Sequence, residues 1–373
     1  MNQNPALNLP RLLAKAAVLF ILANLLFAVL NPTPALGRVS AYNWLFPGRE
    51  RFPYGDDPAR AFNLSLFSLE AMFASHEIAA PAEAEEYRVI LIGDSSTWGF
   101  LLRPEDTLAA RLNARQIVTV GGQRVRFYNL GYPTLSLTKD LLFLDEAMRY
   151  QPDLVIWLVT LESFPGSKQL SSPLVQHNLP RLQTLVSQCQ LNLDLNDPGL
   201  ERPTFYSRTL LGQRRPLADL LRLQLYGALW AATGVDQAYP AEYGPPQSDF
   251  EPDASFHDLT PETFGSSNSL AWDVFNAGFA RVGGTPVLVV NEPIFISDGQ
   301  NSDIRYNFFY PRWAYDAYRQ ALAQASQSGG WAYLDAWDLV PAAEFTNQAI
   351  HLTPAGEELL AEAVARAVES ILK

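Results

Sequence analysis

Residues 88–95 read RVILIGDS, a short apolar run that ends in a glycine, an aspartate and a serine. Four similar runs follow along the chain: VRFYNLGY (125–132), DLVIWLVT (153–160), PVLVVNEP (286–293) and WAYLDAW (331–337). Continuous apolar runs, unlike alternating ones, indicate strands buried on both faces, as in a parallel sheet covered by helices. The chain is therefore expected to contain a five-stranded, mostly parallel sheet.

Amphipathic helical patterns lie between these runs. Residues 140–150 and 313–325 carry apolar side chains at helical spacing, and the clearest pattern follows Thr353, which can cap a last helix with Pro354 in its first turn. Alternating strands and helices predict a three-layer, doubly wound α/β fold. The interval after the third strand far exceeds the dozen or so residues that a crossover needs. We therefore predict an inserted cap or accessory region at 165–282.

The N-terminal residues predict a membrane anchor. Residues 16–30 read AAVLFILANLLFAVL, with no charged residue, and Arg11 and Lys15 lie before them. The run is near the lower limit of about 17–25 residues that a membrane span needs. The positive-inside rule then keeps the N-terminus in the cytoplasm and places the rest of the chain outside it. A cleaved signal peptide is the alternative, although NPTPALG matches a cleavage site poorly.

These patterns divide the chain into three predicted parts. An anchor or signal occupies 1–37, a membrane-proximal linker occupies 38–84, and a globular domain occupies 85–373. The segment 216–235 is apolar enough to suggest a second span, but Asp219 and Arg222 within it argue against one.

Composition excludes several classes of function. The 373 residues include 27 Lys and Arg against 39 Asp and Glu, which gives a net charge of −12. This acidity argues against nucleic-acid binding, which needs clustered Lys and Arg. A single cysteine, Cys189, allows neither an internal disulfide nor a cysteine-based zinc site, and the histidines show no metal-binding spacing. We therefore expect no metal and no cofactor.

Two polar residues stand where chemistry is expected in such a fold. Ligands of open α/β sheets bind at the carboxyl ends of the strands, where Ser95 follows the first strand. His351 precedes the last helix, in the loop after the fifth strand. A serine attacks a carbonyl when a base accepts its proton, and histidine is the usual base. The fold can bring these two loops together at one edge of the sheet.

Three motifs carry a resemblance to a known family. GDSSTWG (93–99), the glycine of NLGYPT (129–134) and HLTPAG (351–356) resemble the SGNH (GDSL-type) hydrolases, over roughly 85–160 and 285–373. The resemblance implies a flavodoxin-like three-layer fold and the hydrolysis or transfer of acyl esters. It implies that Ser95 is the nucleophile and His351 the base.

The resemblance also implies how a negatively charged intermediate is held. The backbone N–H groups of Ser95 and Gly131 would donate to the oxyanion, an interaction worth a few kcal/mol for each donor. Asp94 would hold the turn that presents the serine.

The sequence departs from the family pattern at two places. In the family, a third sequence motif, Gly-x-Asn-Asp, follows the third strand and supplies an asparagine side chain to the oxyanion hole. This chain has Thr160 after its third strand and no asparagine there. Asn291, after the fourth strand, can point into the same crevice. The family's aspartate before the histidine is replaced by Gln348, preceded by Asn347, whose amide can orient the imidazole but cannot stabilise its charge. The carboxylates that can act in its place are Glu162, Glu292 and Asp338.

The sequence therefore predicts a membrane-anchored, extracytoplasmic serine esterase or acyltransferase. An O-acyl carbohydrate is the substrate class that the resemblance suggests, and the aromatic segment 292–313 is either part of its pocket or an ordered loop. The alternative is a degenerate relative that binds an envelope glycan or a protein without turnover, as the two altered motifs suggest. A scaffold built on the inserted region is a third hypothesis.

Overall fold

The computed structural model describes residues 8–41, 43, 48–54, 68–81, 83, 85–264 and 269–373, so part of the predicted linker lies outside the described residues. Its centre is a five-stranded parallel sheet in the order β2-β1-β3-β4-β5. The strands are β1 (Glu86–Ile92), β2 (Arg124–Asn129), β3 (Leu154–Val159), β4 (Val287–Asn291) and β5 (Ala332–Asp335). The five predicted strands and their parallel arrangement are confirmed.

The central strands β1, β3 and β4 are buried on both faces, because alternate side chains enter two separate cores. In β1, Ile90 and Ile92 belong to one apolar cluster, whereas Val89 and Leu91 belong to the other. Neighbouring side chains of a strand point to opposite faces, so an uninterrupted apolar run fills both cores at once.

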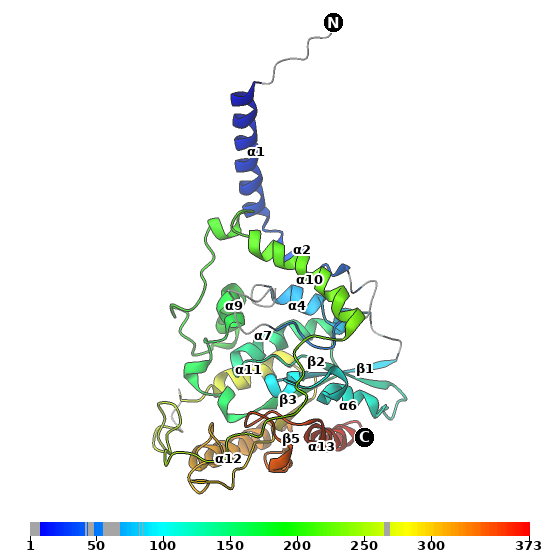
Figure 1. Cartoon of the computed structure of the whole chain (residues 1–373), viewed down its shortest axis with the longest axis vertical. Coiled ribbons are helices and arrows are strands. Elements are labelled where there is room, and N and C mark those ends of the chain that lie inside the picture. The colour runs from blue at the N-terminus through cyan, green and yellow to red at the C-terminus, as the bar shows by residue number, and fades with distance from the viewer. Residues whose placement is uncertain are drawn as a thin grey trace.

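Helices cover each face of the sheet. Side chains of α7 (Leu137–Ala147), α11 (Trp272–Val282) and α12 (Arg312–Gly329) enter the first cluster. Side chains of α6 (Leu108–Ala114) and α13 (Pro354–Ile371) enter the second. Figure 1 shows α7 and α11 on one side of the strands and α6 and α13 on the other. The predicted three-layer α/β fold is therefore confirmed.

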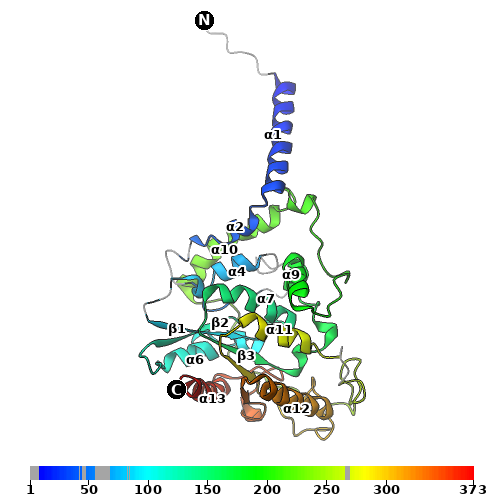
Figure 2. The ribbon, with the colours of Figure 1, turned by 180° about the vertical axis from the view of Figure 1, so that it is seen from behind.

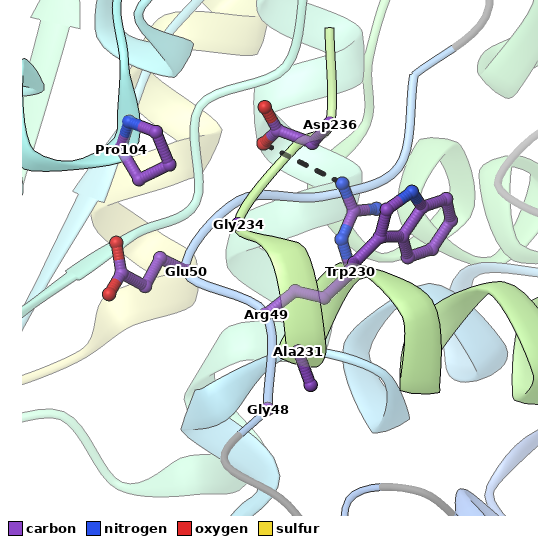
Figure 3. A pocket seen from close by; sticks show the side chains of 8 residues that line it. All are labelled: Gly48, Arg49, Glu50, Pro104, Trp230, Ala231, Gly234 and Asp236. Atoms are coloured by element: carbon purple, nitrogen blue, oxygen red, sulfur yellow. Dashed lines mark ion pairs between the residues drawn. The ribbon is translucent and has the colours of Figure 1, made fainter.

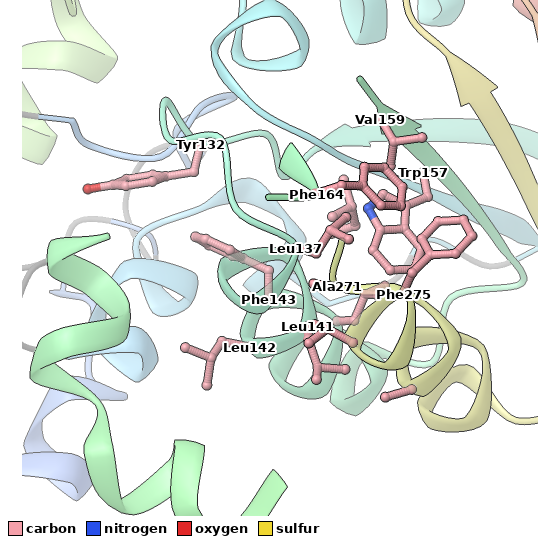
Figure 4. Packing of buried hydrophobic residues seen from close by; sticks show 14 of the residues in the cluster. Tyr132, Leu137, Leu141, Leu142, Phe143, Trp157, Val159, Phe164, Ala271 and Phe275 are labelled. Carbon is pink, nitrogen blue, oxygen red and sulfur yellow. The ribbon is translucent and has the colours of Figure 1, made fainter. Parts of the chain in front are cut away.

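Aromatic side chains fill much of the larger core. The Trp157 ring of β3 lies 4.9 Å from the Phe275 ring of α11, and Phe275 lies 5.4 Å from Phe164. Figure 4 shows these rings beside the leucines of α7. Gly278 of α11 makes this approach possible, since a Cβ there would lie 2.3 Å from the Trp157 ring.

The last helix begins as its sequence predicts. The Thr353 hydroxyl accepts a hydrogen bond from the Gly356 N–H at 3.2 Å, and Pro354 occupies the first position of α13. Proline suits this position because the first N–H groups of a helix have no partner within it.

The N-terminal helix α1 (Leu9–Leu30) stands away from the body of the protein in both views (Figures 1 and 2). Its mean hydropathy reaches 2.4, and 6% of that apolar window is buried. Among the described residues it is the one helix long and apolar enough to cross a membrane. A signal sequence has the same properties.

The predicted inserted region contains several short helices and one long one. Its helices before α11 are α8 (Pro173–His177), α9 (Leu179–Cys189) and α10 (Arg214–Thr233), and α11 itself packs on the sheet. Among the described residues, the other short α-helices are α2 (Thr33–Gly37), α4 (Leu69–Ala74) and α5 (Ser95–Trp98). The short 3₁₀ helices in the same part of the chain are η2 (Glu77–Ala79), η3 (Pro104–Asp106), η4 (Met148–Tyr150), η5 (Leu161–Ser163), η6 (Gly166–Lys168), η7 (Tyr206–Arg208) and η8 (Ala342–Glu344).

Candidate active site

Ser95 is the first residue of the single-turn helix α5, directly after β1. Asp94 caps this turn, because its carboxylate accepts a hydrogen bond from the Ser96 N–H at 2.8 Å. Gly99 ends the turn with φ of +84°, a conformation that glycine adopts without strain. The GDSSTWG motif thus follows β1 directly and forms a capped turn that ends at Gly99, which presents Ser95 at the carboxyl edge of the sheet.

His351 reaches Ser95 from the loop between β5 and α13. The His351 Nε2 atom lies 2.8 Å from the Ser95 hydroxyl, across 256 positions of sequence. On the other side of the ring, Nδ1 lies 3.4 Å from Oδ1 of Asn347. An amide oxygen accepts hydrogen bonds, so Asn347 favours the tautomer with a proton on Nδ1. That tautomer leaves Nε2 free to accept the Ser95 proton.

The imidazole of His351 is shielded from water. His351 is 4% exposed, whereas Ser95 is half-buried. The Phe100 ring lies 5.0 Å from the imidazole. Burial lowers the pKa of His351 from 6.5 to about 4. His351 is therefore neutral at neutral pH, which is the form that accepts a proton.

Buried charged groups lie beneath the Ser95 turn. The Lys139 ammonium donates to the carbonyl of Gly93 at 2.6 Å and to that of Tyr132 at 3.2 Å, and it pairs with Asp140 at 2.6 Å. Burial raises the pKa of Asp94 to about 6. Lys139 thus joins the end of β1 to the loop after β2. Sequence analysis did not identify this role, because an isolated lysine in a helix usually faces solvent.

Gly131 packs closely against the Ser95 turn, but its N–H is already bonded. A Cβ at Gly131 would lie 2.5 Å from the backbone nitrogen of Trp98, so only glycine fits there. Its N–H donates to Oδ1 of Asn129 at 3.1 Å. In this arrangement the Gly131 N–H is not available to an oxyanion unless the Asn129 side chain moves.

Two other predicted oxyanion residues have partners elsewhere. The Thr160 hydroxyl lies 2.8 Å from that of Tyr310 and is fully buried. The Asn291 amide donates to Asp335 at 2.8 Å, and its oxygen accepts from Tyr315 at 3.4 Å. The structure therefore does not bring Thr160 or Asn291 into hydrogen-bonding contact with the Ser95–His351 pair.

Two of the carboxylates considered as substitutes for the family's aspartate, Glu162 and Glu292, have other partners, and Asp338 makes no hydrogen bond to the His351 ring. Glu162 pairs with His257 at 3.1 Å and with Lys168, and Glu292 accepts from the Thr97 hydroxyl at 3.3 Å. Among the described residues, the hydrogen-bonding partners of the His351 ring are Ser95 and Asn347. Asn347 therefore contacts the ring nitrogen of His351 that does not face Ser95.

A clamp from distant segments holds the loop that carries Phe100. The buried Arg51 guanidinium donates to the carbonyls of Gly99 and Leu102 at 2.8 and 2.9 Å, and it pairs with Asp236 at 2.7 Å. Gln237 donates to the same two carbonyls at 3.1 and 2.9 Å. No local sequence signal indicates this clamp, because its members lie far apart in the chain.

Beside the clamp is a pocket between residues 48–50 and the end of α10. Figure 3 shows Arg49 over the Trp230 ring and directed at Asp236, with distances of 3.6 Å to the ring centre and 3.7 Å between charged atoms. Ser95 and His351 do not line this pocket. Its contacts connect α10 to the body of the protein.

The aromatic segment 292–313 is an ordered loop packed by its own side chains. Tyr306 and Tyr310 are buried, and Arg305 donates to the carbonyls of Asp253 and Phe308 at 2.9 Å each. This packing matches the second of the two interpretations given for the segment. No group of three His, Cys, Asp or Glu side chains able to hold a metal occurs among the described residues.

Comparisons with known proteins return similar folds at low identity. No protein-family model matches the chain, and no curated protein matches it. A solved alpha/beta hydrolase from the metagenome of Lake Arreo, Spain, is 14% identical with a TM-score of 0.39, over 77% of this chain and 96% of its own.

Two further solved structures extend this comparison. A putative lipolytic protein of the G-D-S-L family from Desulfitobacterium hafniense DCB-2 is 12% identical with a TM-score of 0.33, over 75% of this chain and 99% of its own. A carbohydrate acetylesterase from Sinorhizobium meliloti is 15% identical with a TM-score of 0.34, over 76% and 99%. The solved structures similar to this chain thus include the GDSL type that its motifs resemble, at identities and TM-scores too low to assign an activity.

Proposed function

We propose that this protein is a serine esterase or acyltransferase in which Ser95 and His351 form the reacting pair. The observation that carries the proposal is the 2.8 Å contact between the Ser95 hydroxyl and His351 Nε2, at the carboxyl edge of a parallel sheet. A nucleophile hydrogen-bonded to a base, with the base oriented by a third group, is the general arrangement of covalent acyl transfer.

The reaction has two balanced steps. The Ser95 oxygen attacks the ester carbonyl while His351 Nε2 accepts its proton, and the alcohol then leaves with that proton, which gives an acyl-enzyme. Water or an acceptor hydroxyl next attacks the acyl carbon and returns a proton through His351 to Ser95. Water gives hydrolysis and a sugar hydroxyl gives transfer. The N–H of Ser95, at the start of α5, is the proposed oxyanion donor that adjoins the nucleophile.

We also propose the location and the substrate class. Helix α1 anchors the chain, and Arg11 and Lys15 at its beginning keep that end in the cytoplasm, so the catalytic domain lies outside it. Ester-linked acyl groups on envelope carbohydrates are the proposed substrates.

A fluorophosphonate probe tests the nucleophile. The full chain should be labelled on Ser95, because the probe reacts with a serine whose proton a base accepts. Ser95→Ala should abolish labelling. Ser96→Ala, which removes the adjacent hydroxyl of the same motif, should leave it intact. Absence of labelling in the natural protein, or labelling that persists in Ser95→Ala, would refute the proposal.

The decrease of kcat/KM at acidic pH should follow the protonation of the buried His351 imidazole. Because burial lowers the pKa of His351 to about 4, kcat/KM should stay level from neutral pH down to about pH 5 and fall by half near pH 4. Asp94→Asn removes the buried carboxyl of the same turn, whose pKa burial raises to about 6, and retains an acceptor for the Ser96 N–H. If kcat/KM falls by half near pH 6.5 in both the natural protein and Asp94→Asn, His351 is not a buried, neutral base.

A degenerate binding protein is the second candidate. It is favoured by the engaged N–H of Gly131 and by an amide, rather than a carboxylate, beside Nδ1 of His351. Both features weaken stabilisation of the charges that form during acyl transfer. Hydrolysis of p-nitrophenyl acetate that disappears in His351→Ala would exclude this candidate.

A further inference from the structure

The outward face of α10 is apolar, which is unusual for a helix exposed to water. Leu221, Leu225 and Leu229 recur every four residues and are 68%, 70% and 57% exposed. Residues at this spacing share one face of a helix. Ala218, Ala228 and Ala232 lie on the same side by helical periodicity. A soluble helix normally places charged residues there.

The acidic residue of α10 lies on its buried side, whereas its leucines lie on the exposed side. Asp219, the one acidic residue of the helix, is fully buried against the protein, on the same side as Leu223 and Gly227. Arg222 pairs with Asp219 at 2.9 Å. The step of two residues from Asp219 to Leu221 turns the helix by roughly 200°, so the leucine face is opposite this buried side.

Contacts at both sides of the helix fix this orientation. Leu223 packs with Ala71 of α4, and Gln224 accepts a hydrogen bond from the Ala41 N–H at 2.7 Å. Near the end of α10, Trp230 lies under the guanidinium of Arg49 (Figure 3). With these contacts in place, α10 cannot rotate its leucines inward.

The apolar face continues into the candidate membrane helix. The N–H of Leu211, just before α10, donates to Oδ1 of Asn24 in α1 at 3.0 Å. Phe205 and Tyr206, which lie beside this contact in sequence, are 60% and 57% exposed. Figures 1 and 2 both show α10 beginning at the base of α1 and running across the side of the body from which α1 emerges.

We propose that α10 lies in the interface of the lipid bilayer that α1 crosses, with Leu221, Leu225 and Leu229 inserted among the acyl chains. The proposal rests on the proposed anchoring by α1. Charge supports a lipid surface as the occupant: residues 201–235 hold five arginines and two acidic residues, although the whole chain carries a net charge of −12. Arginines beside an apolar helix face suit anionic headgroups.

This arrangement connects the membrane surface to the candidate active site. Helix α10 ends at Thr233, and Asp236 and Gln237 follow it directly into the clamp on the loop that carries Phe100. A helix fixed in the interface therefore also fixes the orientation of the catalytic domain relative to the bilayer.

Lipid quenching of a fluorophore tests the proposal on the full chain. In a Cys189→Ser background, a bimane label is placed at Leu225→Cys and the protein is reconstituted into phosphatidylcholine–phosphatidylglycerol vesicles that carry doxyl-labelled lipids. Leu19→Cys in α1 is the embedded reference. Leu359→Cys is the aqueous reference, because it lies in α13, on the far side of the body from α1 (Figure 1). Iodide quenching measures exposure to water in parallel.

The label at Leu225 should behave like the label at Leu19. Lipid quenching should be at least about threefold stronger at Leu225 than at Leu359, with iodide quenching in the reverse order, because an interfacial face is buried some ångströms into the acyl boundary. If the label at Leu225 is quenched by lipid as weakly as the label at Leu359, while the label at Leu19 is quenched strongly, the proposal for α10 is overturned and the proposed anchoring by α1 is retained. A disulfide dimer through Leu225→Cys without lipid quenching would also overturn it, because a second copy would then cover the face. Absence of quenching at Leu19 would separately refute anchoring by α1.

Discussion

His351→Ala is expected to lower kcat/KM for p-nitrophenyl acetate by about 10⁴-fold, because the Ser95 hydroxyl then has no base to accept its proton. Ser95→Ala should cost a similar factor, since it removes the nucleophile that the same base serves. The double variant should be no slower than either single variant, because both residues act in one step. Initial rates of the three variants and the natural protein measure this directly.

The matched control replaces a histidine that has a different partner. His257 pairs with Glu162 rather than with Ser95, so His257→Ala should change the rate by less than about threefold. Thermal unfolding of each variant checks that the fold is retained. Additive losses from Ser95→Ala and His351→Ala would show that the two residues do not act together, and equal losses from the two histidine variants would contradict the assignment of the base.

Asn347→Asp should increase the rate, because it restores a negative charge beside the base. Oδ1 of Asn347 lies 3.4 Å from Nδ1 of His351, so a carboxylate at this position stabilises the imidazolium that forms in the transition state. Asn347 is exposed, and solvent screening limits the gain to about tenfold in kcat.

The same substitution should also move the pH profile. A nearby carboxylate favours the charged imidazole and raises the pKa of His351, so the acidic limb should shift upward from about pH 4. Gln348→Glu is the control, since it adds the same charge one residue away. If Asn347→Asp leaves both kcat and the acidic limb of the pH profile unchanged, the amide of Asn347 does not act on His351. Equal changes in Asn347→Asp and Gln348→Glu would show the same.

The sheet could be predicted from sequence because its signal is local. The apolar runs of β1, β3 and β4 are long enough to mark strands buried on both faces, and burial of both faces is typical of parallel strands covered by helices. The start of α13 was equally predictable, because Thr353 accepts a hydrogen bond from an N–H of the first turn and Pro354 has no N–H to leave unpaired.

The candidate site was only partly predictable. Parallel strands end at one edge of the sheet, so residues that follow β1 and β5 were expected to approach each other, and the structure places Ser95 and His351 within 2.8 Å. The expectation for Gly131, Thr160 and Asn291 assumed that their polar groups face the crevice. In the structure, those groups bond to other partners. The partner of the Gly131 N–H is the nearby Asn129, whereas Thr160 and Asn291 bond to residues from distant parts of the chain that no local pattern identifies.

The sequence by itself determined the sheet, the apolar N-terminal helix and the presence of a serine and a histidine at strand ends, since each depends on residues close together in the chain. Tertiary structure alone decided that Phe100 shields the imidazole, that Arg51 and Asp236 hold its loop, and that the leucines of α10 face outward. These features arise from contacts between residues as far apart as Phe100 and His351, which are 251 positions apart, and such contacts exist only once the packing of the whole chain has chosen the neighbours of each side chain.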